Sequence, residues 1–229
     1  MQKLEKIDAS IYKRVFVVGD IHGELTLLHN HLKTLNFDYQ NDLLISVGDL
    51  IDRGEDSLGC LELINEKWFK TVRGNHEDLM IHSVKYQNMS YAMDWFRNGG
   101  TWYQNLTEDD KMWAKTLINQ ADNELPYVIE LTYDDKKYVI CHADWEGNIY
   151  RDDVDIDFPA QSCILWSRDR IENFNSGIGS RIDGAHLFIF GHTYVPGPTK
   201  FENCLYIDTG AVFGRHLTIL EFGVSPWLI

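Results

Sequence analysis

The feature that most constrains the fold is an alternation of short apolar runs and amphipathic stretches in the first third of the chain. Runs of β-branched and other apolar residues predict buried strands over residues 15–18, 43–47 and 69–72. After each run, apolar residues recur at helical spacing, which predicts helices over residues 25–35, 58–68 and 76–85. This β-α-β-α-β-α order is typical of an α/β sheet with crossover helices.

The pattern changes after residue 89. Residues 90–123 are dense in aromatic side chains, and Thr107 followed by acidic residues reads as a helix N-cap, so we expect a small helical insert whose aromatic residues are mainly core. Further on, we expect a hairpin around Asp134-Asp135, a surface loop over 144–159, a helix over 164–174, and strands over 187–190, 205–207 and 217–220. Since neither repeats nor linkers are evident, we predict one domain over residues 1–229, with the insert at about 90–123.

Charge and cysteine usage limit the possible partners. The net charge of −14 disfavours binding to nucleic acid, because phosphate backbones would be repelled. The 4 cysteines are scattered through the chain and are typical of buried thiols in a reducing compartment. No apolar run is long enough to span a bilayer, so we expect a cytoplasmic protein without membrane contact. The absence of heptads and of long exposed apolar runs favours a monomer or a weak oligomer.

Polar residues with oxygen or nitrogen donors directly follow the predicted strands. The first three segments are Gly19-Asp20-Ile21-His22-Gly23, Gly48-Asp49-Leu50-Ile51-Asp52-Arg53-Gly54 and Arg73-Gly74-Asn75-His76-Glu77. Ligands collect at the carboxyl ends of strands in an open α/β sheet, so we expect these side chains to meet at one edge. The candidate metal ligands are Asp20, His22, Asp49, Asn75, His142 and His192.

This ligand set predicts a particular kind of metal site. Asp20 and His22 stand two residues apart in an extended segment, so their side chains leave the backbone on the same side. Asp49 has two carboxylate oxygens and is able to bridge two ions. Mixed carboxylate, amide and imidazole ligation suits Mn²⁺, Fe or Zn²⁺ better than Cu(I) or Ca²⁺. Two such ions, roughly 3.5–4 Å apart, share a hydroxide whose pKa falls toward neutrality, an arrangement that splits phosphoesters.

The same motifs contain candidates for proton transfer and phosphate binding. We predict His76 as the proton donor to the leaving oxygen, with Asp52 as its partner. Arg53 and Arg73 offer planar guanidinium groups that fit phosphoryl oxygens. Glu77 is expected to orient neighbouring groups rather than to ligate a metal ion.

At these residues the chain resembles the phosphoprotein phosphatase family of metal-dependent Ser/Thr phosphatases, and in particular its compact bacteriophage lambda-type and bacterial members. The signature G-D-x-H-G, G-D-x-x-D-R-G and G-N-H-E, followed by two histidines, is present in order. The resemblance implies a calcineurin-like metallophosphoesterase sandwich, with α-β-β-α layers and two mixed sheets. It implies one ion on Asp20, His22 and Asp49, and a second on Asp49, Asn75, His142 and His192. The metal implied is Mn²⁺, with Fe, Zn or Ni as alternatives.

The resemblance also implies an activity. Phosphoserine and phosphothreonine in proteins would be hydrolysed by direct attack of a hydroxide held by both metal ions, and phosphotyrosine and small aryl phosphates would also be accepted. Phosphate would be bound by Asn75, His76, Arg53 and an arginine that follows Trp166. Arg168 fits that place, although Arg170 is close enough to remain an alternative. The setting would be the cytoplasm of a bacterial cell or of a phage-infected host.

Two alternatives differ in what the site does. A symmetrical dinucleoside tetraphosphate hydrolase shares the first motifs, but that family typically has Asp after Gly-Asn-His and lacks the first Asp of Asp-Arg-Gly. Glu77 and Asp52 therefore favour the phosphatase. A catalytically silent metal-binding interaction module is the other alternative, but every expected acid, base and ligand position is filled.

Overall fold

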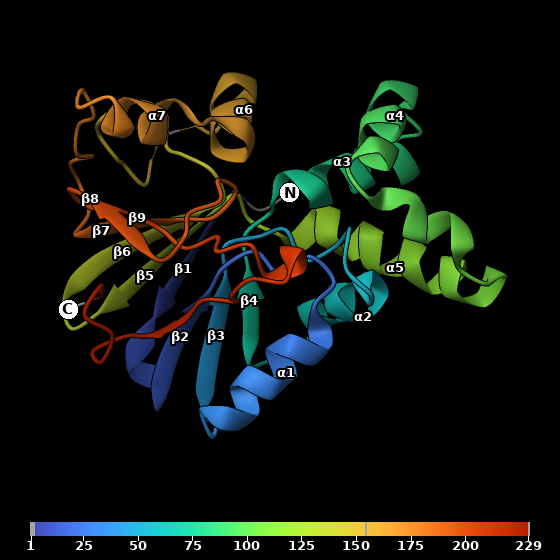
Figure 1. The fold of residues 1–229 in the computed structure, drawn as a ribbon, viewed down its shortest axis with the longest axis horizontal. Helices are drawn as coiled ribbons and strands as arrows, with labels where there is room; N and C mark the ends of the chain where they lie inside the picture. Colours follow the sequence, from blue (N-terminus) through green and yellow to red (C-terminus); the bar gives the residue numbers. More distant parts are fainter. Residues whose placement is uncertain (1–2, 154, 229) are drawn as a thin grey trace.

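Two β-sheets pack face to face, and helices cover both outer faces (Figure 1). This computed structural model describes residues 3–153 and 155–228, so one position of the predicted 144–159 loop lies outside the described residues. Helices α6 and α7 lie over the larger sheet, and α1, α2 and α5 lie beside the smaller one (Figure 1). The layers are α-β-β-α, which confirms the fold class predicted from the sequence.

Both sheets are mixed. The larger sheet has the order β1-β5-β6-β7-β9-β8, in which β5–β6 and β8–β9 are antiparallel and the other pairs are parallel. Its strands are β1 (Leu4–Asp8), β5 (Val128–Tyr133), β6 (Lys136–Cys141), β7 (Leu187–Phe190), β8 (Thr199–Phe201) and β9 (Cys204–Tyr206). In the smaller sheet, β2, β3 and β4 run parallel and β10 is antiparallel to β2. Its strands are β2 (Arg14–Val18), β3 (Asp42–Ser46), β4 (Phe69–Thr71) and β10 (Ile219–Glu221).

Alternation along β2 explains why the layers stack. Successive side chains of a strand point to opposite faces. Val15 and Val17 accordingly join the apolar core between the two sheets, whereas Phe16 and Val18 join the core between the smaller sheet and its helices. A third core, which includes Ile164, lies between the larger sheet and its helices.

The helices largely follow the predicted pattern, with two differences. The α-helices are α1 (Leu25–Thr34), α2 (Ser57–Glu62), α3 (Asn75–Val84), α4 (Met89–Arg97), α5 (Glu108–Glu124), α6 (Phe158–Trp166) and α7 (Asp169–Asn175). The 3₁₀ turns are η1 (Ala9–Ile11), η2 (Leu63–Asn65), η3 (Gly100–Asn105) and η4 (Ala211–Phe213). The predicted 58–68 helix ends early, because the chain leaves η2 to bury Trp68 before β4. The predicted 164–174 helix is two helices that break at Ser167, whose backbone is extended.

The sequence pattern predicts the start of the long helix of the insert, but it does not predict two of the short strands. Thr107 caps α5 as predicted, because its hydroxyl accepts a hydrogen bond from the Asp110 amide. β1 and β8 were not predicted as strands, and both lie at edges of the larger sheet. Short edge strands have few buried positions, so their sequence alternation is weak.

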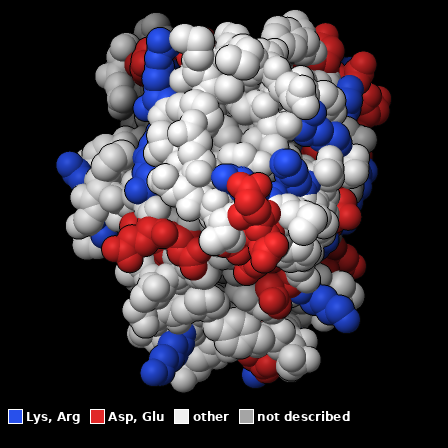
Figure 2. All heavy atoms as spheres, turned by 90° about the vertical axis from the view of Figure 1, so that its right-hand side faces the viewer, with Lys and Arg blue, Asp and Glu red and all other residues white. Residues whose placement is uncertain are grey.

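The surface is strongly acidic in places. Figure 2 shows Asp and Glu side chains gathered across the middle of the face at the right of Figure 1, with Lys and Arg scattered around them. In the described part of the chain, no helix has the length and apolar character needed to cross a membrane.

Candidate metal centre

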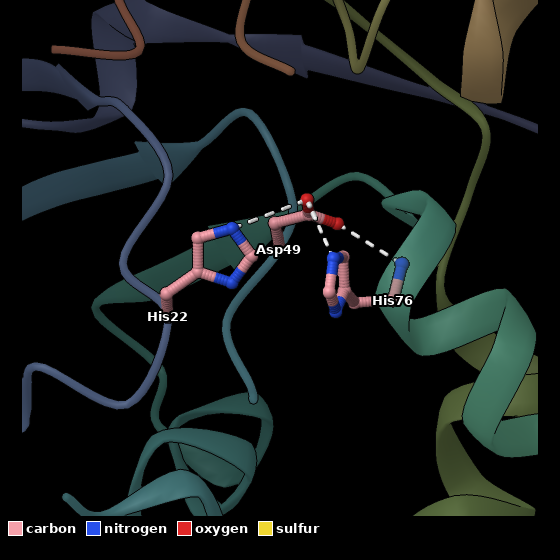
Figure 3. Close-up of side chains that lie close together, drawn as sticks. All are labelled: His22, Asp49 and His76. Carbon is pink, nitrogen blue, oxygen red and sulfur yellow. Dashed lines mark hydrogen bonds and ion pairs between the residues drawn. The ribbon is translucent and has the colours of Figure 1, made fainter. Parts of the chain in front are cut away.

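One carboxylate lies at the centre of the predicted ligand cluster. The Asp49 Oδ2 atom is 3.5 Å from His22 Nε2 and 3.9 Å from His76 Nε2 (Figure 3). It is also 3.4 Å from His142 Nε2. The other oxygen of Asp49 accepts a hydrogen bond of 3.1 Å from the His76 amide. These side chains follow β2, β3, β4 and β6, so the carboxyl ends of four strands deliver them to one place.

Two groups of potential metal ligands share Asp49. The first comprises Asp49, His22 and His76, and the second comprises Asp49, His142 and His192; in each group the ligand atoms lie within 4.8 Å of one another. A carboxylate common to two such groups has the placement expected of a bridging ligand between two ions.

The two remaining predicted ligands border the second group. Asn75 Oδ1 lies 2.9 Å from His142 Nε2 and 3.1 Å from His192 Nδ1. The Asp20 carboxylate accepts hydrogen bonds of 3.2 and 3.0 Å from the His192 amide. The structure therefore brings together all six side chains that the sequence singled out as ligands.

Hydrogen bonds to backbone carbonyls set the orientation of two of the imidazoles. His22 Nδ1 lies 2.8 Å from the Ile51 carbonyl, and His142 Nδ1 lies 2.8 Å from the Val47 carbonyl. Each Nδ1–H therefore donates a hydrogen bond, and each Nε2 faces the cluster. Metal-ligating histidines are commonly oriented in this way.

Burial and mutual charge interactions strongly shift the pKa values within the cluster. Burial lowers the pKa of His22 to about 3, and burial together with His142 lowers the pKa of His192 to about 3, so both are neutral and have lone pairs for ligation. The pKa of Asp49 lies well below its usual range, because His142 and His76 outweigh the effect of burial. Burial alone would lower the pKa of His142, but the Asp49 charge raises it to about 9.

The donor set therefore fits divalent metal ions. Among the described residues, His192 Nε2 is one of few buried polar side-chain atoms without a hydrogen-bond partner. A buried imidazole nitrogen without a partner is costly unless a ligand satisfies it. Around it stand carboxylate, amide and imidazole groups, the types that hold Mn²⁺, Fe or Zn²⁺.

Backbone strain is concentrated at the same place. His22, Asp49, Asp52, Arg53 and His192 have φ angles of 46°, 53°, 76°, 72° and 62°. Residues with a Cβ rarely adopt such angles, and they persist where surrounding contacts overdetermine the conformation. Functional sites are a common location of this strain.

The predicted proton donor and its partner are in contact. His76 Nδ1 lies 2.6 Å from Asp52 Oδ2, and both side chains are buried. His76 Nε2 faces Asp49 on the opposite side of the ring. Burial works to lower the pKa of His76, but Asp49 and Asp52 outweigh it and raise the pKa.

Glu77 has the orienting contacts predicted for it. Its carboxylate accepts hydrogen bonds from the backbone amides of Asp49, Leu50 and Gly74 at 2.8–2.9 Å. It therefore ties the turn after β3 to the start of α3. Gly74 is required at this junction, because a Cβ there would overlap the Asp49 carboxylate.

The predicted arginines have different placements. Arg53 is exposed, and its guanidinium lies 2.7 Å from His22 Nε2, at the cluster. Arg168 is also exposed and donates to the Thr193 hydroxyl, next to His192. Arg170 is buried, and its hydrogen bonds go to Asp144 and to the loop that follows it. Of the two arginines left open by the sequence, Arg168 is the one placed near the ligands.

Arg73 is not brought to the cluster. Its guanidinium is buried, lies 3.3 Å from Asp78 and 3.2 Å from Asp122, and stacks over the Tyr127 ring at 5.2 Å. These contacts use its donors on the side of α3 and α5. They do not support the phosphate-binding role predicted from the motif, and we interpret Arg73 as a structural residue.

Three residues near the site were not assigned a role from the sequence. Burial raises the pKa of Asp20, and the charge of the buried Asp208 raises it further. Trp95 and Trp102 both donate hydrogen bonds to Asp52. The sequence signal for the tryptophans is a dense group of aromatic residues, which predicts core packing and not these hydrogen bonds.

Comparisons with known proteins agree with this geometry. Residues 13–196 match the family described as calcineurin-like phosphoesterase. Serine/threonine-protein phosphatase 1 of Salmonella typhimurium is 42% identical over 94% of this chain and 94% of its own length. Serine/threonine-protein phosphatase 2 of Escherichia coli is 41% identical over 91% of this chain and 93% of its own length.

More distant relatives carry a different name. The asymmetrical bis(5'-nucleosyl)-tetraphosphatase PrpE of Anoxybacillus flavithermus is 30% identical over 90% of this chain and 89% of its own length. A crystal structure described as a putative diadenosine tetraphosphatase has a TM-score of 0.69 at 23% identity, covering 98% of this chain and 96% of that one, and so supports the fold alone. The family match and the bacterial phosphatase relatives together show that this chain belongs to the calcineurin-like metallophosphoesterases, of the lambda-type phosphoprotein phosphatase group.

Proposed function

We propose that this protein is a metal-dependent phosphoprotein phosphatase that hydrolyses phosphoserine and phosphothreonine, and also phosphotyrosine and small aryl phosphates. The observation that carries the proposal is the pair His76–Asp52, 2.6 Å apart, placed beside an Asp49 carboxylate that two groups of potential metal ligands share. Relatives named serine/threonine-protein phosphatases, similar over nearly the full length, support the substrate class.

The six side chains of the cluster would hold two divalent ions. Asp20, His22 and Asp49 would bind one ion, and Asp49, Asn75, His142 and His192 would bind the other. When bound, two such ions supply Lewis acidity, which lowers the pKa of water and neutralises phosphoryl charge. The orienting bonds to His22 and His142 hold their Nε2 atoms toward the ions.

The other residues act on the substrate. The exposed guanidinium groups of Arg53 and Arg168 would bind phosphoryl oxygens with paired N–H donors, and Asn75 and His76 would complete the phosphate site. His76 would give a proton from Nε2 to the leaving oxygen, while Asp52 accepts the hydrogen bond from Nδ1 and fixes the ring. Such a proton transfer contributes about 10²–10⁴-fold to the rate.

Steady-state hydrolysis tests the proposal. Purified protein stripped of metal should release phosphate from a phosphoserine peptide and from p-nitrophenyl phosphate only after Mn²⁺ is added. His76→Asn should bind Mn²⁺ normally, measured by calorimetry, and lose at least about 100-fold in kcat on the peptide. If no metal preparation releases phosphate from either substrate, the proposal is wrong.

A dinucleoside tetraphosphatase is the second candidate. The relatives named bis(5'-nucleosyl)-tetraphosphatases favour it, although those are asymmetrical enzymes and the sequence pattern suggested the symmetrical kind as the alternative. The phosphopeptide and a dinucleoside tetraphosphate should be offered together at equal concentration. Chromatography of the reaction mixture then measures how fast each one is consumed. The phosphatase proposal requires the phosphopeptide to be consumed first.

Several finer features belong to the same proposal. We expect Mn²⁺ as the preferred ion, with Fe, Zn or Ni as substitutes, and a protein that acts as a monomer or weak oligomer in the cytoplasm. We also expect one domain over residues 1–229, with the helical insert docked on it. Metal titrations, light scattering and limited proteolysis test these points respectively.

A further inference from the structure

We propose that Trp95 and Trp102 are positioning residues: their indole N–H groups fix the Asp52 carboxylate, and through it they aim His76 at the leaving oxygen. The inference rests on the proposed function, because it assigns a task to the helical insert in that same reaction. Trp95 lies on α4 and Trp102 on η3 of the insert.

Both carboxylate oxygens of Asp52 have indole donors. Oδ1 accepts from Trp102 Nε1 at 2.6 Å and from Trp95 Nε1 at 3.0 Å. Oδ2 accepts from Trp95 Nε1 at 2.9 Å and lies 2.6 Å from His76 Nδ1. Trp102 therefore holds Oδ1, Trp95 bridges both oxygens, and Oδ2 also contacts the imidazole.

Asp52 is fully buried, so these donors matter energetically. Its exposed fraction is 0%, and a buried carboxylate without donors is strongly disfavoured. Hydrogen bonds to a charged group are stronger than those between neutral groups, and each also restricts rotation of the carboxylate. The Asp52 amide donates to Ser57 Oγ at 2.9 Å, which fixes the backbone as well.

The insert is built to dock on this turn. Gly99 has a φ of 114°, and a Cβ there would lie 2.9 Å from the Arg53 amide nitrogen and 3.3 Å from Asp52 Cβ. A Cβ at Gly100 would lie 2.5 Å from Trp95 Nε1. The glycine pair thus lets the insert approach the strained Asp52-Arg53 backbone closely enough for the indoles to reach the carboxylate.

Positioning of the acid has a kinetic signature that packing alone lacks. An alkoxide leaving from phosphoserine needs a proton, whereas p-nitrophenolate is a good leaving group and departs with little help. Losing the orientation of His76 should therefore slow the peptide much more than the aryl phosphate. Loss of folded protein or of metal would slow both substrates by the same factor.

The test compares three matched Trp→Phe variants in Mn²⁺. Trp102→Phe removes a donor from a half-buried ring and should lower kcat on the phosphoserine peptide about tenfold, with KM unchanged. Its kcat on p-nitrophenyl phosphate should fall less than about twofold. Trp95→Phe should change the ratio of the two kcat values in the same direction.

Trp113→Phe is the control within the same insert. Trp113 lies on α5, and its indole donates to Glu62 at 2.6 Å rather than to Asp52. This variant should keep the wild-type ratio of the two kcat values.

The outcomes separate the inference from the proposed function. Metal-dependent hydrolysis by the wild type tests the function alone. If the wild type is active, yet Trp102→Phe and Trp95→Phe slow both substrates equally, or slow neither, the positioning role is overturned. Should one variant fail to fold by circular dichroism, the ratio measured on the other decides.

Discussion

Replacing Arg73 by Met separates a structural role from a catalytic one. In the structure its guanidinium is 1% exposed and lies between the carboxylates of Asp78 and Asp122. Removing one partner of a buried ion pair leaves an uncompensated charge and costs about 3–5 kcal/mol. Asp122 keeps Lys85 and Tyr86 at 2.7 Å, so the cost should lie near the lower end, about 3 kcal/mol.

The assay is urea unfolding followed by far-ultraviolet circular dichroism. We expect a lower midpoint at an unchanged m-value, together with a Tm reduced by about 6–12 °C, since about 2–4 °C corresponds to each kcal/mol in a chain of this size. The kcat per folded molecule should fall far less than in the control. Arg53→Met is that control: it should lose about 100-fold in kcat with little change in stability, because Arg53 is exposed at the cluster.

One result would refute this reasoning. If Arg73→Met unfolds at the wild-type urea concentration and yet loses as much kcat as Arg53→Met, then Arg73 reaches the substrate. The motif-based prediction would then hold, and the interpretation of the buried contacts would be wrong.

Three further predictions concern separate parts of the molecule. Asp49→Asn should abolish binding of both Mn²⁺ ions, measured as metal content after dialysis, because Asp49 belongs to both ligand groups. Thr107→Ala should lower the free energy of unfolding by about 1 kcal/mol with kcat unchanged, since the hydroxyl caps α5 by accepting from Asp110; urea unfolding measures it. Burial raises the pKa of Cys163 and Cys204 to about 12, so these thiols should not react with iodoacetamide at neutral pH. Mass spectrometry of the treated protein should show no alkylation of either thiol, and the activity should be unchanged.

The ligand cluster could be predicted from the sequence because its geometry is local and repeated. Each ligand follows an apolar run, a glycine lies near the end of the run in every case but that of His142, and parallel strands bring their carboxyl ends to one edge. A position in a motif does not reveal the direction of a long side chain. Arg53 and Arg73 both lie within motifs, yet only Arg53 is directed at the cluster, because carboxylates on α3 and α5 hold Arg73.

The tryptophans illustrate a different limit. Helical spacing places Trp95 in the apolar core, which is correct, since it is 1% exposed. The same ring also carries a polar N–H, and its partner Asp52 lies 43 residues earlier in the chain. Such a contact depends on how the insert docks, and spacing within the insert carries no information about docking. The Gly99-Gly100 pair was visible in the sequence, but its reason is the approach to Asp52 and Arg53.

The net charge of the chain and the charges near the cluster have opposite effects on an anionic substrate. A net charge of −14 opposes phosphorylated substrates at long range. At physiological ionic strength, exposed charges more than about 8 Å apart are largely screened, so acidic side chains beyond that distance act weakly on a phosphate at the cluster. Arg53 and Arg168 are both exposed, and neither forms an ion pair with a carboxylate in the part of the chain that the structure describes. Under the proposed function, their charge would be available to the substrate, so an acidic protein would bind an anion through two guanidinium groups that have no carboxylate partner.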